Sequence, residues 1–341
     1  MKSKNIFKMW LLLSALWLTA GCSVIDDDLS DCYQESQYKM EYQLRLITNV
    51  STEISTKLSA VTEIGVNTAL TAYLTKIFTP YAHDVDLSFY DTDGSFVRLY
   101  HDTPQMEAEQ KSYTLTLPMR QYRHLAVANI ANDKMVDLKD DEYSNTSKLI
   151  QNEGTKATLP LKYIPSHTIG IFTARESMEV LEGVDQTFNV KLYMANSAVS
   201  LVIDPKGQPY NDIQVFATGF ASSFNINDST YVYSATPPLV KSDEVATGSP
   251  LLCYTSVNFP SRDADASAPG ATLWHFKVYV TKTDNTITET VLDITEPLLA
   301  GELKIIKGSL DSDCAVRPYD STVGVSVTLD WNKGGEYNPE L

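Results

Sequence analysis

The chain has 341 residues, of which 43 are acidic and 27 are basic, and its formal net charge at pH 7 is −16. Nucleic-acid binding needs clustered Lys and Arg that displace counterions, so this charge argues against a nucleic-acid partner. It argues equally against electrostatic attraction to an anionic lipid surface. The length is too great for one small core and fits two medium-sized domains.

The first 21 residues are typical of a bacterial secretory signal. Lys2, Lys4 and Lys8 supply a positive segment before a short apolar core, Met9–Leu18, and small residues then lead to Cys22. The apolar stretch is about half the ~20 residues of a membrane-spanning helix, which favours cleavage. We therefore predict a signal peptide over residues 1–21 and a lipoprotein acylated (palmitate-type chains) on the thiol of Cys22. The alternative is an ordinary signal peptide followed by a coincidental cysteine.

An acidic run follows the predicted lipid site. Asp26, Asp27, Asp28 and Asp31 lie within ten residues of Cys22. Residues 22–36 are accordingly expected to form a solvated tether. The run also resembles the surface-export signals of Bacteroidetes lipoproteins, and both interpretations stay open. No other stretch is apolar and long enough to span a bilayer, so the acyl chains would be the membrane attachment, held stably when more than one chain is present.

Most of the remaining chain is predicted to form β-strands. Val85–Tyr90 alternates, Asp91–Gly94 supplies an Asp-Gly pair that tolerates positive φ in a tight turn, and Ser95–Tyr100 returns. Frequent Thr, Val and Tyr with punctuating Pro and Gly are typical of antiparallel sandwiches. Further strands are predicted over Tyr113–Leu117, Tyr122–Ile130, Thr187–Met194, Val199–Ile203, Ile213–Ala217, Thr230–Tyr233, Trp274–Thr281, Thr286–Ile294, Leu303–Gly308 and Val323–Trp331.

One segment has helical periodicity instead. Between Asn67 and Phe78 the apolar residues recur at helical spacing, with Asn67 or Thr68 as a possible cap and Pro80 as a stop. We expect this helix to pack against the first of two sandwiches. The boundary between the domains is predicted near Met194–Ser197, which gives domains over residues 37–195 and 196–341.

The cysteines other than Cys22 are odd in number. Cys32, Cys253 and Cys314 remain, so at least one must be unpaired or pair with another chain. A disulfide between Cys253 and Cys314 is the more plausible pairing because both fall in the second half. No spacing resembles a zinc or redox motif.

No motif of catalysis or metal binding is present. The five histidines (His83, His101, His124, His167 and His275) are scattered, and neither a hydrolase elbow nor a phosphate-binding glycine loop occurs. Asp91–Gly94 resembles the opening of a calcium loop, but Phe96 replaces the required glycine, so a turn is favoured. We therefore predict a protein that is not an enzyme, with no catalytic, metal or cofactor residue. The many tyrosines could line a glycan-binding face or form cross-strand pairs within the sheets.

Several stretches resemble the fimbrial anchor subunits of Bacteroidales, the fimbrillin-associated lipoprotein anchors of type V fimbriae. The matches run in order along almost the whole mature chain. They are the lipidated start Cys22–Cys32 (CSVIDDDLSDC), the hairpin Asp86–Val97, the strand Leu117–Asn129, and the closing runs Ala300–Lys307 and Val323–Glu336.

The resemblance implies a mainly β fold with two tandem transthyretin-like, Greek-key β-sandwich domains, as in fimbrillins. The short helix predicted from periodicity would belong to the first of them. It also implies a non-enzymatic role at the base of a fimbria: holding it to the outer membrane at the cell surface and limiting its assembly. The implied partners are fimbrial stalk or accessory subunits, which associate by strand exchange or edge contact.

The end of the chain departs from a polymerising subunit. After Trp331 only a short polar tail, Asn332–Leu341, remains, and it contains no apolar alternating segment that could serve as a donor strand. This suits a terminal subunit. The alternative function is a surface glycan-binding lipoprotein that works beside a nutrient importer, for which a concave face of exposed Tyr and Trp would be required.

Overall fold

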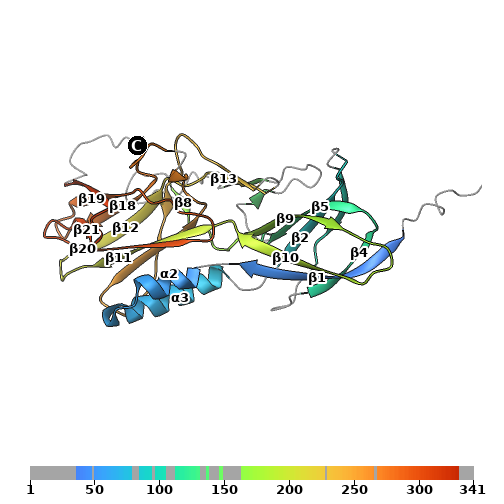
Figure 1. The fold of residues 1–341 in the computed structure, drawn as a ribbon. Helices are drawn as coiled ribbons and strands as arrows, with labels where there is room; N and C mark the ends of the chain where they lie inside the picture. The colour runs from blue at the N-terminus through green and yellow to red at the C-terminus, as the bar shows by residue number, and fades with distance from the viewer. Residues whose placement is uncertain are drawn as a thin grey trace, which may run out of the picture.

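The computed structural model describes residues 36–47, 50–78, 84–93, 97–104, 112–130, 136–137, 146–148, 163–226, 229–264 and 267–329. Within these ranges the chain forms 22 strands and two α-helices. The predicted mainly β architecture is therefore confirmed. The molecule is elongated, with two β-sandwiches placed end to end and a helical layer beneath one of them (Figure 1).

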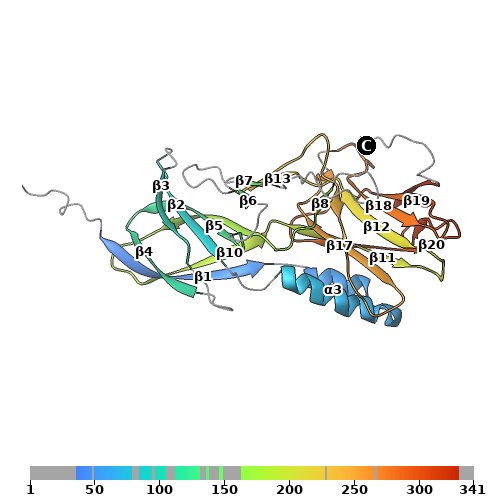
Figure 2. The same cartoon turned by 180° about the vertical axis from the view of Figure 1, so that it is seen from behind.

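The first sandwich is one seven-stranded sheet that folds back on itself. Its strands β9 and β10 pair only at Tyr193–Thr173 and Met194–Phe172, so the sheet divides there into two facing layers. In both views β1 lies below β2 and β5 (Figures 1 and 2). In order across the sheet, the strands are β3 (Arg98–Asp102), β2 (Val85–Tyr90), β5 (Gln121–Ala128), β9 (Phe172–Glu179), β10 (Gln186–Met194), β1 (Gln37–Ile47) and β4 (Ser112–Pro118).

The second sandwich consists of a five-stranded and a six-stranded sheet. The five-stranded sheet has the order β16 (Asp243–Glu244), β17 (Leu252–Asn258), β11 (Ser197–Asp204), β20 (Leu303–Leu310) and β21 (Val316–Pro318). The six-stranded sheet has the order β22 (Gly324–Thr328), β19 (Ile287–Ile294), β18 (Trp274–Thr281), β12 (Asp212–Thr218), β15 (Val240–Lys241) and β8 (Ile164–Pro165).

A small four-stranded sheet links distant parts of the chain. It has the order β14 (Thr230–Val232), β13 (Ser223–Asn225), β7 (Thr146–Lys148) and β6 (Val136–Asp137). The hairpin β13–β14 follows β12 of the second sandwich, whereas β6 and β7 come from the segment after β5. The short parallel pair between β8 and β15 makes a second connection of this kind.

The helical layer packs on the second sandwich, which corrects the expectation that it covers the first. Helix α2 (Val50–Lys57), the 3₁₀ turn η2 (Val61–Glu63) and helix α3 (Ile64–Ile77) lie beneath the five-stranded sheet (Figure 1). Polar contacts fix them there: the hydroxyl of Tyr73 donates to Oδ2 of Asp243 at 2.6 Å, and Nζ of Lys307 lies 3.0 Å from Oε1 of Glu63. The apolar stripe of α3 covers the sheet because burying it is what stabilises an amphipathic helix.

Two hydrophobic clusters run through the molecule, and each contains side chains of both sandwiches. The first cluster joins the interior of the first sandwich, such as Leu87 and Phe89, to the buried face of α3 and to Val202 of β11. The second cluster fills the interior of the second sandwich around Trp274 and continues to Leu125 on the outer face of β5. The sandwiches consequently share their cores instead of meeting at a polar linker.

The predicted elements agree with the structure in several places. Strands β2 and β18 have the predicted bounds Val85–Tyr90 and Trp274–Thr281. Helix α3 begins earlier than predicted, at Ile64 instead of Asn67, because Asn67 does not cap it: its Nδ2 donates to the carbonyl of Leu58 at 3.0 Å.

Candidate functional site

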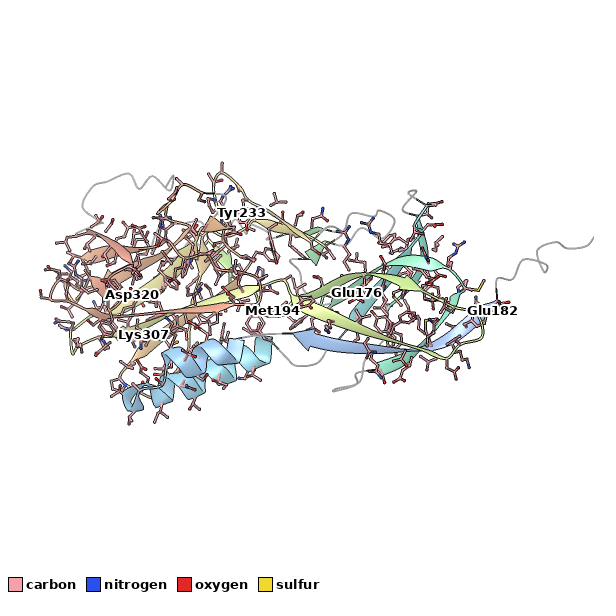
Figure 3. The ribbon with its side chains drawn as sticks, in the orientation of Figure 1. Glu176, Glu182, Met194, Tyr233, Lys307 and Asp320 are labelled. Atoms are coloured by element: carbon pink, nitrogen blue, oxygen red, sulfur yellow. The ribbon has the colours of Figure 1, made fainter. Side chains whose placement is uncertain are left out.

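The described part of the chain begins at the free end of the first sandwich, which is the end that lies away from the second sandwich. Cys22 and Cys32 lie outside the described residues, and strand β1 begins at Gln37, which pairs with Pro118. The turn that follows Pro118 is bound to the turn between β9 and β10, because the amide of Val180 donates to the carbonyl of Arg120 at 3.0 Å. Figure 3 shows Glu182, in the second of these turns, at the extreme end of the molecule. A tether attached to β1 would therefore leave from this end.

Strand β1 spans the first sandwich from its free end to the junction with the second. It pairs in parallel with β10 from Met40 to Ile47 and antiparallel with β4 from Gln37 to Gln43. The buried side chains of Met40, Tyr42 and Leu44 alternate with more polar neighbours, which is the period of a half-buried strand. The first strand of the described chain thus lies between two others, not at an edge.

A hydrogen-bonded pair fixes β1 to the opposite layer. The hydroxyl of Tyr42 lies 2.5 Å from Nε2 of His124 in β5, and Nδ1 of His124 lies 3.1 Å from the carbonyl of Ser88. Burial lowers the pKa of His124 to about 4, so the ring is neutral. Nδ1–H then donates to Ser88, and Nε2 accepts from Tyr42, whose pKa burial raises.

The junction between the sandwiches is built around Asn196. This residue is fully buried in the two-residue connection between β10 and β11. Its Oδ1 accepts from the amide of Ile171 at 2.6 Å, its Nδ2 lies 2.5 Å from Nδ1 of His167, and its carbonyl accepts from the amide of Gly301 at 2.8 Å. Burial lowers the pKa of His167 to about 3, so this ring is also neutral and its Nδ1 accepts. The side chain of Asn196 thereby ties the connection to the segment before β9, and its main-chain carbonyl ties it to the segment before β20.

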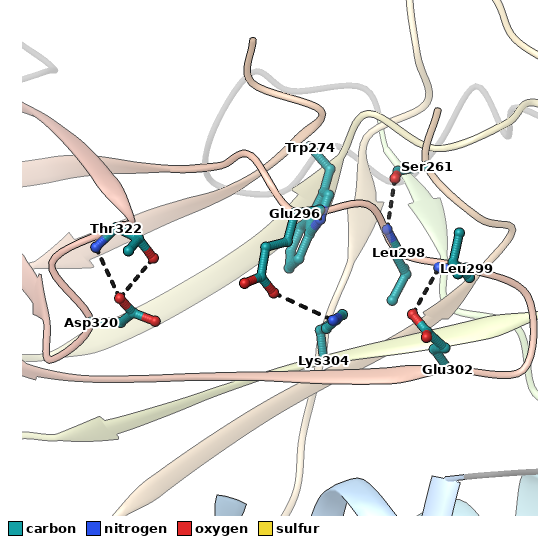
Figure 4. A network of polar contacts seen from close by, with 9 residues as sticks. All are labelled: Ser261, Trp274, Glu296, Leu298, Leu299, Glu302, Lys304, Asp320 and Thr322. Atoms are coloured by element: carbon teal, nitrogen blue, oxygen red, sulfur yellow. Dashed lines mark hydrogen bonds and ion pairs between the residues drawn. The ribbon is translucent and has the colours of Figure 1, made fainter. Parts of the chain in front are cut away.

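The segment that leads into β20 contacts this junction through Gly301 and is itself held by several hydrogen bonds (Figure 4). Nε1 of Trp274 donates to the carbonyl of Glu296 at 2.9 Å, and Oγ of Ser261 accepts from the amide of Leu298 at 2.9 Å. Oε2 of Glu302 accepts from the amide of Leu299 at 3.1 Å. These bonds hold Gly301 in place for its contact with Asn196, and the hydroxyl of Tyr231 adds a bond to the carbonyl of Ala195 at 2.7 Å.

Strand β22 offers a free sheet edge in the second sandwich. Of the described strands, it pairs with β19 alone, from Gly324–Asp293 to Thr328–Glu289. The side chains of Val325 and Val327 are half-buried, whereas Ser326 and Thr328 are exposed. Unpaired backbone groups along such an edge can accept a strand from another chain.

The aromatic side chains are packed, which does not favour a glycan-binding face. Trp274, Tyr42, Tyr122 and Tyr279 are among the largest fully buried side chains. Among the described aromatic residues, only Tyr193 and Tyr319 are largely exposed. They lie on different sandwiches: Tyr193 is near the junction, and Tyr319 follows β21.

The expected disulfide between Cys253 and Cys314 does not form in this structure, where both thiols are free and buried. The two side chains belong to different hydrophobic clusters. Cys253, on β17, belongs to the first hydrophobic cluster and lies near Oγ1 of Thr255. Cys314 belongs to the second cluster, in the turn between β20 and β21, and contacts the carbonyl of Pro209.

Two further histidines, His101 and His275, form ordinary cross-strand pairs with aspartates. Nε2 of His101 lies 2.8 Å from Oδ2 of Asp86, and Nδ1 of His275 lies 2.7 Å from Oδ1 of Asp293 on the neighbouring strand. Within the described part of the chain, no group of three or more His, Cys, Asp or Glu is placed to hold a metal ion. Neither described helix has the length and apolar character needed to cross a membrane.

Comparison with known proteins identifies the family. A family model described as fimbrillin-A associated anchor proteins Mfa1 and Mfa2 matches residues 49–333. No curated protein matches the sequence. Among solved structures, a protein of Bacteroides thetaiotaomicron described as a candidate adhesin is 9% identical, with 85% of this chain and 97% of that chain covered and a TM-score of 0.51, which shows a shared fold.

Two fimbrial proteins of Porphyromonas gingivalis are also similar. The anchor protein Mfa2 is 11% identical, with 86% of this chain and 99% of that chain covered and a TM-score of 0.44. The tip protein Mfa3, truncated at its C-terminus, is 10% identical, with 87% and 100% covered and a TM-score of 0.45. Because the family model matches most of its length, the chain belongs to the family of fimbrillin-A associated anchor proteins.

Proposed function

We propose that this chain is a non-enzymatic outer-membrane lipoprotein, acylated on Cys22, that anchors a type V fimbria at the cell surface and limits its assembly. Membership of the anchor family supports the fimbrial role. The observation that carries the anchoring role is the position of β1, which begins at the free end of the first sandwich, directly after the tether. A lipid on Cys22 would hold that end towards the membrane.

The tether length fits this arrangement. Residues 22–36 connect the lipid site to β1, and an extended chain of this length reaches at most about 50 Å. Its aspartates would keep it solvated. The first sandwich would then stand next to the membrane, and the second sandwich, with the helical layer packed on it, would face outward.

The pairing of β1 supports a role in limiting assembly. Because the chain's own strand already lies between β10 and β4, no strand from another subunit can be added there without displacing it. Contact with a fimbrial subunit is therefore proposed at the opposite end of the molecule, along the free edge of β22. Its exposed Ser326 and Thr328 leave that edge accessible.

Acylation is tested by replacing the cysteine. Cys22→Ala should abolish incorporation of a labelled fatty acid and move the protein out of the membrane fraction. Cys32→Ala is the matched control in the same segment and should remain acylated and membrane-bound. A Cys22→Ala protein that is still acylated and still sediments with membranes would refute the lipoprotein assignment.

The fimbrial contact is tested by site-specific crosslinking in native outer membranes. A photo-reactive phenylalanine analogue at Ser326 should give adducts that contain a fimbrial subunit, identified by mass spectrometry. The same probe at Glu182, on the opposite end, should give none. Adducts with a fimbrial subunit from Glu182 and none from Ser326 would reverse the proposed orientation, and adducts with an importer alone would favour the glycan-binding alternative.

A further inference from the structure

Tension on an anchored protein would enter the fold through β1. β1 is the first described strand after the tether, and it starts at the end of the molecule that lies away from the second sandwich. Its other end, Ile47, pairs with Tyr193 beside the junction. The long axis of β1 therefore runs along the long axis of the molecule (Figures 1 and 2). A pull on the N-terminus against the second sandwich is directed along this strand.

The direction of the pull determines how the hydrogen bonds are loaded. Inter-strand bonds run across the strands, roughly perpendicular in antiparallel pairs and slanted in parallel ones. A force along β1 therefore loads its bonds to β10 and to β4 together. Strand β1 has eight register pairs with β10 and seven with β4, and residues Met40–Gln43 are paired on both sides. All of these bonds resist before any of them separates.

The side chains of β1 also oppose its sliding along the strand direction. Met40, Tyr42 and Leu44 are buried in the first hydrophobic cluster, so sliding β1 would draw apolar surface through the packed interior. The bond from Tyr42 to His124 crosses to the opposite layer and would have to break in the first step of sliding. Beyond the strand, β10 continues through the Asn196 junction into β11, so the load passes into the second sandwich.

The last described strand has the opposite geometry. Strand β22 has five register pairs, all with β19, and its end at Thr328 lies opposite Glu289, close to the turn between β18 and β19. A pull between the C-terminus and that turn acts across the strand and separates the pairs one after another. The first and the last described strands therefore differ in how a pull loads their hydrogen bonds: a pull loads those of β1 together and those of β22 one after another.

We propose that β1 has a mechanical function: it is a tension-bearing clamp that resists extraction when the N-terminus is pulled. The biological need for the clamp rests on the proposed function, because the lipid on Cys22 is where the load would be applied. The clamp itself is a property of the folded chain and can be measured without membrane or fimbria.

Single-molecule force spectroscopy on the unlipidated mature chain, residues 22–341, tests the clamp. Thr283→Cys, in the exposed turn between β18 and β19, provides one attachment in a Cys22→Ser, Cys32→Ser background, with the buried Cys253 and Cys314 retained. The other attachment is the N-terminus in one experiment and the C-terminus in a second. We expect the first rupture to need several-fold more force through the N-terminus, because forced unfolding reports the barrier to separating the loaded bonds.

A pair of tyrosine variants separates the clamp from general stability. Tyr42→Phe removes the bond to His124 and should lower the rupture force through the N-terminus while leaving that through the C-terminus unchanged. Tyr38→Phe, on the same strand and outside the Tyr42–His124 pair, should change neither. The unchanged C-terminal rupture also shows that the variants are folded.

Two results would overturn the clamp: rupture through the N-terminus at a force equal to or below that through the C-terminus, or a Tyr42→Phe effect of the same size in both directions. Failure of the anchoring function would be recognised separately. In that case Cys22→Ala would stay in the membrane fraction, and the force measurements would be unaffected.

Discussion

The hydroxyl of Tyr42 and the imidazole of His124 meet at 2.5 Å in the interior of the first sandwich, although 82 residues separate them in the chain. Tyr42 lies on β1, the first of the described strands, and His124 lies on β5 in the facing layer. The ring of His124 stacks on Phe89 with a centroid distance of 4.3 Å, which fixes its orientation. The pair thus joins the two layers at the strand that connects to the tether.

Loss of this bond should destabilise the protein measurably. Tyr42→Phe keeps the ring and leaves Nε2 of His124 buried without its donor, at a cost of about 1–3 kcal/mol. Urea unfolding followed by circular dichroism would measure the change in unfolding free energy. Tyr38→Phe on the same strand should cost less than about 0.5 kcal/mol. Equal effects of the two substitutions would contradict the role of the bond.

Acidification should destabilise the protein through two buried histidines. Burial lowers the pKa of His124 to about 4 and that of His167 to about 3, both below the ordinary value of 6.5. The unfolded chain then binds protons more readily than the folded chain. The contribution of the two neutral histidines to the free energy of unfolding is complete above about pH 6.5. It is lost as the pH falls towards 4, at up to about 1.4 kcal/mol per histidine and pH unit.

Unfolding free energies measured between pH 7 and pH 4.5 would check this dependence. The free energy should fall steadily over that interval. The double variant His124→Gln, His167→Gln should show a flatter profile. An equally steep profile in the double variant would assign the dependence to other groups.

The junction should depend on a single amide side chain. Asn196→Ala removes the acceptor for the amide of Ile171 and the donor to His167, both in a buried site. We expect a loss of about 2–4 kcal/mol, since each buried group left without a partner costs about 1–3 kcal/mol. Asn189→Ala, exposed on the preceding strand, is the control. Thermal unfolding of both variants would measure the difference, and similar melting temperatures would refute the role of the junction.

The helical layer should stabilise the second sandwich. Leu70 of α3 is fully buried against the five-stranded sheet, so Leu70→Ala should cost about 2–5 kcal/mol. Hydrogen exchange should become faster in β11 and β17. Thr71→Ala, on the exposed side of the same helix, should leave exchange unchanged. Faster exchange confined to β2 and β5 would instead place the helix on the first sandwich.

Local periodicity explains how much of the fold could be predicted from the sequence. Strands such as β2 and β18 were predictable because their apolar residues alternate or lie next to clear turn signals. Strand β17 was missed because it is buried on both faces, by α3 on one side and by the six-stranded sheet on the other, so its residues do not alternate. Strand β1 does alternate at Met40, Tyr42 and Leu44, yet it is absent from the prediction.

The buried polar contacts at the junction could not be predicted from the sequence. His167 and Asn196 are 29 residues apart, and neither lies in a motif that suggests the other. The position of the helices could not be predicted either, because residues 50–77 precede β2 of the first sandwich but contact β16, β17 and β20, which lie about 170 residues or more further along the chain. Contacts of this kind are fixed by the topology of the whole chain.

The helical layer comes early in the chain but packs on the second sandwich, and this arrangement also sets the order in which the protein can fold. A chain that emerges N-terminus first exposes the apolar face of α3 until β17 and β20 have appeared, and β1 waits for β10. Neither core can close until most of the chain is present, which predicts slow folding and a need for protection from aggregation in the interval. Fragments that end after β10 would keep the apolar face of α3 uncovered. We therefore expect the two sandwiches to fold only together, in the same chain.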